Sequence, residues 1–310
     1  MHRPSGAEPV LQTKDLGKRY GDRWAVRGLN LQVHRGDVFG FLGPNGAGKS
    51  TTIRMVLSLI APTSGEVELF GRSLNLHRTE SLRSVGGIVE KPDFYLYLSA
   101  VRNLEIVGSL IGGVARQRIL EVLDLVGLGD RGRDLVKTYS HGMKQRLGIA
   151  QALLGDPELV ILDEPTNGLD PQGMKEIREL IVHLARDRRK TVFLSSHLLN
   201  EVEMVANRMA ILAKGELVAQ GEVEELLKSG GQYVFVTGEP GTRIRSVLRG
   251  LPLSVTKFEE KEGGFEIWMD QGDIPSLNAQ LVRRGVRVAS IVPRRSLEEY
   301  FLSITEPQER

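Results

Sequence analysis

Nine consecutive residues, GPNGAGKST at Gly43–Thr51, constrain this chain more than any other segment. They follow an apolar, β-prone stretch at Val38–Leu42, so the pattern G-x-x-x-x-G-K-[ST] stands between an expected strand and an expected helix. Glycines adopt backbone angles that other residues avoid, and the amides of such a loop can converge on an anion at the N-terminus of the following helix. The segment therefore predicts a phosphate-binding loop for a nucleoside triphosphate rather than an ordinary glycine-rich turn.

Each part of this loop has an expected role at the nucleotide. The ammonium of Lys49 is expected to contact the β- and γ-phosphates and to act in catalysis, and the hydroxyl of Ser50 is expected to reach Mg²⁺. The residues predicted to hold the nucleotide are Gly43, Pro44, Asn45, Gly46, Ala47, Gly48, Lys49, Ser50 and Thr51.

The length and composition narrow the class of protein. A chain of 310 residues suits one large domain and one small one, or two domains. The 41 basic and 39 acidic residues nearly cancel, so bulk charge does not demand nucleic acid, and the absence of cysteine excludes disulfides and thiol catalysis. The N-terminus lacks the apolar stretch of a secretory signal, and the most apolar window, Leu104–Val114, is too short to cross a bilayer. We therefore expect a cytoplasmic chain that reaches a membrane only through a partner.

Short apolar segments alternate with helical periodicity over the first two thirds of the chain. Between about residues 99 and 155 the apolar residues follow a helical period, and further helices are expected at Lys49–Ile60 and from Pro171. This alternation predicts an α/β fold with a mostly parallel sheet and a helical insertion. The expected strands are Val10–Leu16, Leu29–Val33, Val38–Leu42, Val67–Phe70, Ser84–Val89, Leu159–Leu162 and Thr191–Leu194.

The composition changes after Gly221, where a short charged helix at Glu222–Lys228 precedes the linker-like Ser229-Gly230-Gly231. Beyond the linker the expected order is β-α-β-β-α-β, the split pattern of a small ferredoxin-like α+β module, followed by an amphipathic helix at Ser296–Ile304. The elements of this module are expected at Tyr233–Val236, Thr242–Arg249, Leu253–Phe258, Phe265–Met269, Ile274–Arg284 and Val286–Val292.

Two carboxylates follow the apolar segment Leu159–Leu162. Asp163 is expected to hold magnesium, directly or through water, and Glu164 is expected to polarise the attacking water as the catalytic base. Acidic residues also commonly end strands, so the pair gains its meaning from the phosphate loop that precedes it in the chain.

The segment YSHGMKQR at Tyr139–Arg146 lies shortly before this carboxylate pair. It is similar to L-S-G-G-Q-x-Q-R, the signature of the ATP-binding cassette (ABC) ATPases, and the chain resembles that family from about Val10 to Gly221. The signature matches at Ser140, Gly142, Gln145 and Arg146, and it departs at Tyr139, His141 and Met143.

The resemblance implies further site residues. Asp170 ends a segment similar to the family's D-loop, His197 is similar to its switch histidine, which senses the γ-phosphate, and Tyr20 is similar to its adenine-stacking aromatic. His197 could instead cap a helix, and Tyr20 could pack in a turn. Ser140 could be the N-cap of the helix that begins near Gly142, and both functions are compatible because an N-cap also presents free amides to a phosphate.

The resemblance also implies an architecture and partners. It implies an α/β P-loop NTPase fold, an ABC ATPase core with a mostly parallel sheet, an antiparallel β subdomain and a helical signature subdomain at about residues 91–155. We place the nucleotide-binding domain at residues 1–228 and a C-terminal α+β accessory domain at residues 229–310. In this family the signature of one cassette covers the ATP of another, which implies a head-to-tail dimer of two copies around two ATP with Mg²⁺. The resemblance also implies that the dimer binds separately encoded transmembrane permease subunits, at the inner face of the cell membrane.

Glu90 stands where most members of the family have a glutamine near the metal. It is expected either to ligate magnesium or to be a loop carboxylate in a salt bridge, perhaps to Lys91. The aromatic-rich stretch Phe94–Tyr97 follows, and it is either a core cluster or a groove for a short helix of a membrane partner.

Glu90 with the following Pro-x-Phe-Tyr, and the form of the signature, are similar to the ATPases of bacitracin- and lantibiotic-type exporters. The leading hypothesis is therefore the ATP-hydrolysing subunit of an exporter of antimicrobial peptides or drugs. The alternatives are a soluble ABC-family ATPase that acts on ribosomes or nucleic acid, and a weakly hydrolysing nucleotide-dependent regulator. Because the chain has a single cassette, no sustained heptads and no strongly basic stripe, no nucleic-acid partner is expected.

Overall fold

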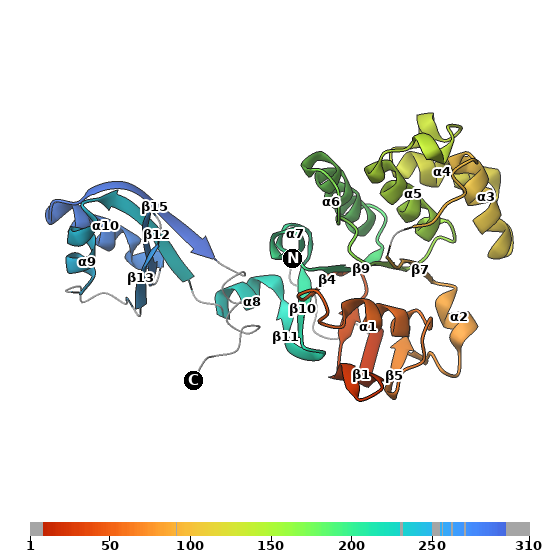
Figure 1. Ribbon diagram of the computed structural model, residues 1–310, viewed down its shortest axis with the longest axis horizontal. Helices are drawn as coiled ribbons and strands as arrows, with labels where there is room; N and C mark the ends of the chain where they lie inside the picture. Colours follow the sequence, from red (N-terminus) through yellow and green to blue (C-terminus); the bar gives the residue numbers. More distant parts are fainter. Residues whose placement is uncertain are drawn as a thin grey trace. The chain divides into compact units, whose positions relative to one another are not determined.

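A computed structural model describes residues 9–90, 92–229, 232–249, 255, 257–261, 263–269 and 271–295. The chain divides into two compact units, Met1–Val223 and Glu224–Arg310, which are described separately (Figure 1). The division comes slightly earlier than the boundary predicted after residue 228, because helix α8 (Val223–Ser229) falls almost entirely in the second unit.

A six-stranded sheet, in the order β11-β10-β4-β9-β8-β7, organises the first unit. All neighbouring pairs are parallel except β10 and β11. The inner strands β4, β9 and β8 are buried along their whole length, which is why their sequences are nearly continuous apolar runs. The strands are β4 (Val38–Leu42), β7 (Val85–Ile88), β8 (Leu159–Leu162), β9 (Thr191–Ser196), β10 (Arg208–Ala213) and β11 (Glu216–Glu222).

A smaller antiparallel sheet accompanies it, in the order β2-β1-β5-β6 with β3 also paired to β1. The single strand predicted at Leu29–Val33 is wrong, because the chain breaks between β2 and β3. Asn30 holds this break: its side chain accepts a hydrogen bond from the amide of Asp15 (2.9 Å) and donates one to the carbonyl of Gly28 (3.1 Å). The strands are β1 (Pro9–Tyr20), β2 (Arg23–Leu29), β3 (Gln32–His34), β5 (Ser64–Leu69) and β6 (Arg72–Ser73).

Helix α1 (Lys49–Val56) follows the phosphate loop and is shorter than the predicted Lys49–Ile60. Ser58 has a φ of 54°, in the left-handed region that a right-handed helix cannot include, and its amide bonds back to Met55. The helix therefore stops before the apolar residues that suggested a longer one.

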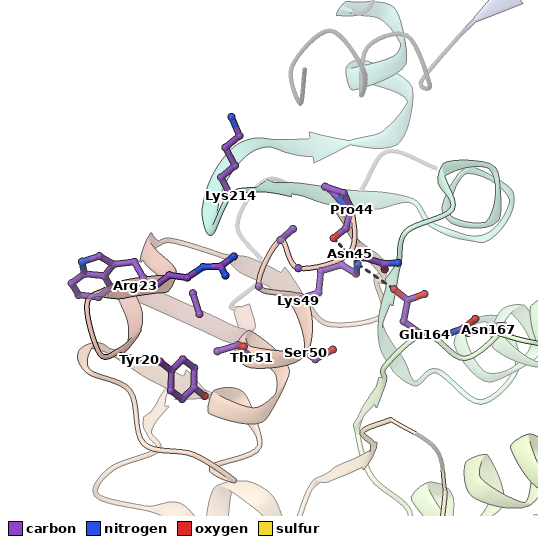
Figure 2. A pocket seen from close by; sticks show the side chains of 15 residues that line it. Tyr20, Arg23, Pro44, Asn45, Lys49, Ser50, Thr51, Glu164, Asn167 and Lys214 are labelled. Carbon is purple, nitrogen blue, oxygen red and sulfur yellow. Dashed lines mark hydrogen bonds and ion pairs between the residues drawn. The ribbon is translucent and has the colours of Figure 1, made fainter. Parts of the chain in front are cut away.

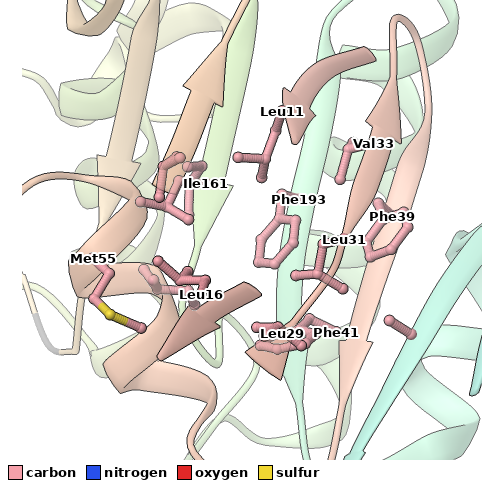
Figure 3. Close-up of a cluster of buried hydrophobic side chains, with 14 of the residues drawn as sticks. Leu11, Leu16, Leu29, Leu31, Val33, Phe39, Phe41, Met55, Ile161 and Phe193 are labelled. Carbon is pink, nitrogen blue, oxygen red and sulfur yellow. The ribbon is translucent and has the colours of Figure 1, made fainter. Parts of the chain in front are cut away.

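One hydrophobic core joins the two sheets and helix α1 (Figure 3). The ring of Phe193 lies 5.6 Å from that of Phe39 and 5.4 Å from that of Phe41, and Leu31 and Ile53 are fully buried in the same cluster. Burying a side chain of this size stabilises the fold by about 1.5–3 kcal/mol. The strand before the phosphate loop and the helix after it are therefore both fixed by the core, which holds the loop between them.

The predicted helical insertion is present between β7 and β8. Helices α3, α4 and α5 pack on one another, and Ser99 caps α3 by accepting a hydrogen bond from the amide of Arg102 (3.3 Å). Among the described residues, no helix is both long and apolar enough to cross a membrane. The remaining helices of this unit are α2 (Arg78–Leu82), α3 (Ala100–Leu110), α4 (Arg116–Leu125), η1 (Gly129–Arg131), η2 (Val136–Thr138), α5 (His141–Leu153), α6 (Pro171–Arg186) and α7 (Leu199–Val205).

The second unit has a four-stranded antiparallel sheet in the spatial order β13-β14-β12-β15. Along the chain, one helix follows β12 and another follows β14. This order and pairing match the split β-α-β-β-α-β topology predicted from the sequence. The helix predicted at Ser296–Ile304 lies outside the described residues. The elements are β12 (Gln232–Glu239), α9 (Gly241–Arg249), β13 (Lys257–Lys261), β14 (Gly264–Trp268), η3 (Gln271–Asp273), α10 (Ile274–Arg283) and β15 (Arg287–Arg295).

Candidate nucleotide site

The predicted site residues meet at the carboxyl edge of the six-stranded sheet. The phosphate loop follows β4, His197 follows β9, Asp163 and Glu164 follow β8, and Glu90 comes two residues after β7. Because these four strands are parallel neighbours, the segments after them lie at one edge, where ligands bind in open α/β sheets.

Two glycines of the loop have no room for a side chain. A Cβ on Gly43 would lie 2.4 Å from the carbonyl oxygen of Leu212, and one on Gly48 would lie 2.5 Å from that of Ala25. Gly48 also has a φ of 109° and precedes α1, so the first amides of the helix stay available to an external acceptor. This geometry suits an anion at the start of the helix.

A cavity of about 790 Å³ opens above the loop (Figure 2). Of the predicted site residues, Tyr20, Glu164 and Pro44–Thr51 line it. Gly43 and His197 are bonded to the lining residues Lys49 and Glu164, and Asp163 is linked to Glu164 through Ser195. The whole lining comprises Tyr20, Arg23, Trp24, Ala25, Pro44, Asn45, Gly46, Ala47, Gly48, Lys49, Ser50, Thr51, Glu164, Asn167 and Lys214.

Lys49 and Glu164 lie against each other in the cavity. The ammonium of Lys49 is 3.2 Å from Glu164 Oε1, and it donates to the carbonyl of Gly43 at 2.6 Å and to that of Pro44 at 3.3 Å. The second oxygen of Glu164 accepts a hydrogen bond from His197 Nδ1 at 2.8 Å. The three predicted catalytic side chains therefore form one connected group.

Ser195 holds the two carboxylates at their positions. Its hydroxyl donates to Asp163 Oδ1 (2.5 Å) and accepts from the amide of Glu164 (2.9 Å), which fixes Glu164 at a φ of 50°. Ser195 was not among the predicted site residues. Its signal was a buried Ser195-Ser196 pair at the end of an otherwise apolar strand, since buried hydroxyls need hydrogen-bond partners.

The residues around the loop fit magnesium by their donor chemistry. The hydroxyl of Ser50 and the carboxylate of Asp163 would offer oxygen ligands, which Mg²⁺ prefers. The described part of the chain holds no cluster of three or more His, Asp or Glu that could bind a metal by itself.

Glu90 forms its ion pair with Arg54 on helix α1. The predicted salt bridge was to Lys91, which lies outside the residues that the structure describes. Glu90 has a φ of 62° and a side chain that is 62% exposed. Glu90 as a magnesium ligand stays a prediction.

Tyr20 ends strand β1 at the rim of the cavity and is half exposed. The ammonium of Lys18 lies 5.4 Å from the centre of its ring and donates to the carbonyl of Ala61 (2.6 Å), so a tethered cation stands against the aromatic ring. Arg23 and Lys214 add two cations to the lining, and neither was predicted. Lys214 comes from the turn between β10 and β11, far along the chain, where no local pattern marks it.

Comparison with known proteins identifies the family. The profile described as "ABC transporter" matches residues 26–167. The bacitracin transport ATP-binding protein BcrA of Bacillus licheniformis is 43% identical over 298 residues, which cover 95% of this chain and 97% of that protein. The chain belongs to the ABC transporter family. It is an ATPase of that family.

Two further comparisons concern a lantibiotic transport protein and a cassette dimer. The lantibiotic transport ATP-binding protein SrtF of Streptococcus pyogenes is 40% identical over 215 residues, which cover 69% of this chain and 92% of that protein. The dimeric cassette MJ0796, solved in a post-hydrolysis state with ADP and Pi, matches with a TM-score of 0.62 and 27% identity over 69% of this chain and 98% of that one.

The ABC signature lies at the start of helix α5. Ser140 is the N-cap, since its hydroxyl accepts from the amide of Met143 (3.2 Å), and the helix begins one residue earlier than predicted, at His141. Tyr139, which replaces the family's leucine, is buried, and its hydroxyl donates to the carbonyl of Arg131 (2.8 Å). Burial raises the pKa of the Tyr139 phenol above its ordinary value.

Four residues predicted to bind nucleotide do not line the cavity: Gly43, whose carbonyl accepts a hydrogen bond from Lys49, and Ser140, Gly142 and Asp170. Asp170 caps helix α6 by accepting a hydrogen bond from the amide of Gly173 (3.0 Å). Ser140, Gly142 and Asp170 therefore do not contribute to the cavity of their own chain.

The aromatic stretch after Glu90 is at the surface. Tyr95, Leu96 and Tyr97 are 51%, 46% and 69% exposed, so the alternative of a core cluster is wrong for these three residues. The side chain of Asn103 fixes the segment by accepting from the amide of Tyr95 (2.9 Å) and donating to its carbonyl (3.1 Å).

Proposed function

We propose that this chain is the nucleotide-binding subunit of an ABC exporter, in which two copies close head to tail around two ATP. The observation that carries this proposal is that Ser140 and Gly142 are not among the residues that line the cavity with Lys49 and Glu164. One chain thus has one incomplete site and one unused signature, and a second copy in the opposite orientation would complete both. The similarity to the dimeric MJ0796 cassette supports the same arrangement.

Nucleotide binding would begin at groups that the cavity already presents. Tyr20 offers a flat ring to the adenine, with Lys18 behind it, and the amides of the loop converge on the phosphates. The ammonium of Lys49 would then exchange the carbonyls of Gly43 and Pro44 for β- and γ-phosphate oxygens. Ser50 and Asp163 would hold magnesium, whose charge would offset that of the phosphates.

Hydrolysis would use the carboxylate that Lys49 and His197 now hold. Glu164 would accept a proton from the attacking water. The oxygen of that water would bond to the γ-phosphorus, while the bond from that phosphorus to the β–γ bridging oxygen breaks. His197, which already donates to Glu164, would orient this carboxylate and sense the γ-phosphate. Loss of the γ-phosphate would release the signature of the second copy and allow the pair to open.

The exposed segment Tyr95–Tyr97 is the proposed contact with a membrane subunit, because aromatic side chains are favoured anchors of interfaces. We propose that separately encoded permease subunits bind here and place the chain at the inner face of the membrane. The names of BcrA and SrtF support a peptide antibiotic as the exported class. The chain's similarity to transport proteins disfavours the ribosome-acting and regulatory alternatives.

Co-expression with a multi-span protein encoded beside this chain tests the proposed function. We expect the two to co-purify from detergent, and we expect Tyr95→Ala with Tyr97→Ala to reduce the recovered membrane protein at least severalfold, because two interface anchors are lost. Leu76→Ala is the matched control, since Leu76 is 80% exposed elsewhere on the surface. Salt-sensitive binding of RNA or DNA without any membrane partner would contradict the proposal.

Glu90→Gln tests the predicted magnesium ligand. If Glu90 leaves Arg54 for the metal in the loaded enzyme, the neutral amide should raise the Mg²⁺ concentration for half-maximal hydrolysis by about three- to tenfold, because a carboxylate is the stronger Mg²⁺ ligand. The measurement is a magnesium titration at fixed ATP. Glu80→Gln, which changes an exposed carboxylate paired with Arg72, is the control. An unchanged titration would remove Glu90 from the metal site.

A further inference from the structure

His141 is one of the three departures from the family signature. It is the first residue of helix α5, directly after the capping Ser140. Its ring nitrogen Nε2 lies 3.3 Å from the carbonyl oxygen of Asn167. A carbonyl oxygen only accepts, so Nε2 carries the hydrogen and donates it. The start of the signature helix is thus bonded to a distant segment of the same chain.

Gly168 makes room for this contact. It has a φ of 74°, and a Cβ built there would lie 3.4 Å from His141 Nε2. A side chain at this position would strain the backbone, and its Cβ would touch the imidazole at ordinary contact distance. The glycine and the histidine therefore fit each other at the surface of one turn.

The turn that His141 contacts carries the proposed catalytic base. The amide of Asn167 donates to the carbonyl of Glu164 (3.1 Å), and the amide of Leu169 donates to that of Thr166 (3.2 Å). Asn167 also lines the nucleotide cavity beside Glu164. A continuous series of contacts therefore runs from His141 through Asn167 and Glu164 to Lys49 on the phosphate loop.

We propose that His141 is a positioning residue that fixes the turn after Glu164 against the first turn of helix α5. Glu164 faces the nucleotide of its own chain, and Ser140 and Gly142 are proposed to face that of the second copy. The imidazole would hold Glu164 and the signature residues in one relative position. When the signature closes on the nucleotide of the second copy, Glu164 would then be aligned at the nucleotide of its own chain. The coupling between the two nucleotide sites rests on the proposed dimer, whereas the contact between His141 and Asn167 does not.

Amide hydrogen exchange in the nucleotide-free chain tests the contact without any dimer. His141→Leu keeps a side chain of similar size and removes the donor, so exchange at the amides of Asn167 and Leu169 should rise about five- to tenfold. His141→Gln offers a side-chain N–H and should restore most of the protection. His77→Leu, a substitution at an exposed histidine beside helix α2, is the control. Native exchange at both amides in His141→Leu would overturn the proposal.

Hydrolysis kinetics test the functional consequence. We expect His141→Leu to lower kcat about three- to tenfold, with the KM for ATP within about twofold of native, because the base is displaced and the cavity is intact. His141→Gln should retain most of the native kcat. Faster exchange at Asn167 combined with native kcat in His141→Leu would show a contact without a positioning role and would also overturn the proposal. Failure of the proposed dimer would leave the exchange result unchanged, so the two failures are distinguishable.

Discussion

Glu164→Gln is expected to bind ATP as the native chain does and to hydrolyse it roughly 10²- to 10⁴-fold more slowly, the usual contribution of a general base. Glutamine keeps the size of the side chain but cannot accept a proton from water. It also loses the charge that faces the Lys49 ammonium at 3.2 Å, so that lysine becomes freer to bind phosphate. The measurements are phosphate release at saturating ATP and the Kd for ATP by fluorescence or calorimetry.

The same variant should accumulate as a dimer when ATP and magnesium are present, because closure precedes hydrolysis and opening follows it. Light scattering of Glu164→Gln with and without nucleotide measures this change in mass. Glu179→Gln on helix α6 is the control, since Glu179 is 67% exposed and pairs only loosely with Lys175. Native turnover in Glu164→Gln would remove this residue as the base, and a monomer at saturating ATP would count against the head-to-tail arrangement.

The parts of the site that were predictable are those encoded in one continuous segment. The phosphate loop, strand β4 and strand β8 have the predicted bounds because buried parallel strands are unbroken apolar runs with abrupt polar ends. Strand β2 (Arg23–Leu29) was missed because its arginines and glycine conceal any apolar alternation. The structure of that segment is set by pairing with β1, which a local pattern does not contain.

The contacts between distant segments were not predictable in detail. Arg23 from strand β2 and Lys214 from the β10–β11 turn line one cavity. Their proximity depends on the complete fold. The partner of Glu90 was sought in its neighbour Lys91, yet helix α1 brings Arg54 to it. Ser195 likewise bonds both Asp163 and Glu164 only because β9 and β8 are adjacent strands.

The pairing of Lys49 with Glu164 could not be expected from the roles assigned to them. Each was predicted to face the nucleotide, the lysine at its phosphates and the glutamate at the attacking water. An ammonium and a carboxylate in a largely buried site attract each other, and Lys49 is only 6% exposed. The same proximity that pairs them here would place both at the γ-phosphate in the loaded site.

Lys49→Ala is expected to weaken ATP binding at least tenfold, which corresponds to about 1.4 kcal/mol. The buried ammonium is the proposed contact with the β- and γ-phosphates, so its loss should weaken ATP more than AMP, which has neither. Lys49→Arg should not restore full affinity, because a planar guanidinium does not fit a position where one nitrogen reaches Gly43, Pro44 and Glu164 together. The measurement is the Kd for ATP, ADP and AMP in the same buffer.

The control for Lys49 comes from the same cavity. Lys214→Ala removes another ammonium of the lining, but Figure 2 shows that this side chain points away from the phosphate loop, so its effect should be small and similar for the three nucleotides. If Lys49→Ala lost affinity for AMP as much as for ATP, the lysine would act through the shape of the loop instead of the terminal phosphates. An unaltered Kd for ATP would contradict the phosphate-loop assignment itself, on which the positions of Glu164 and Ser50 at the nucleotide also depend.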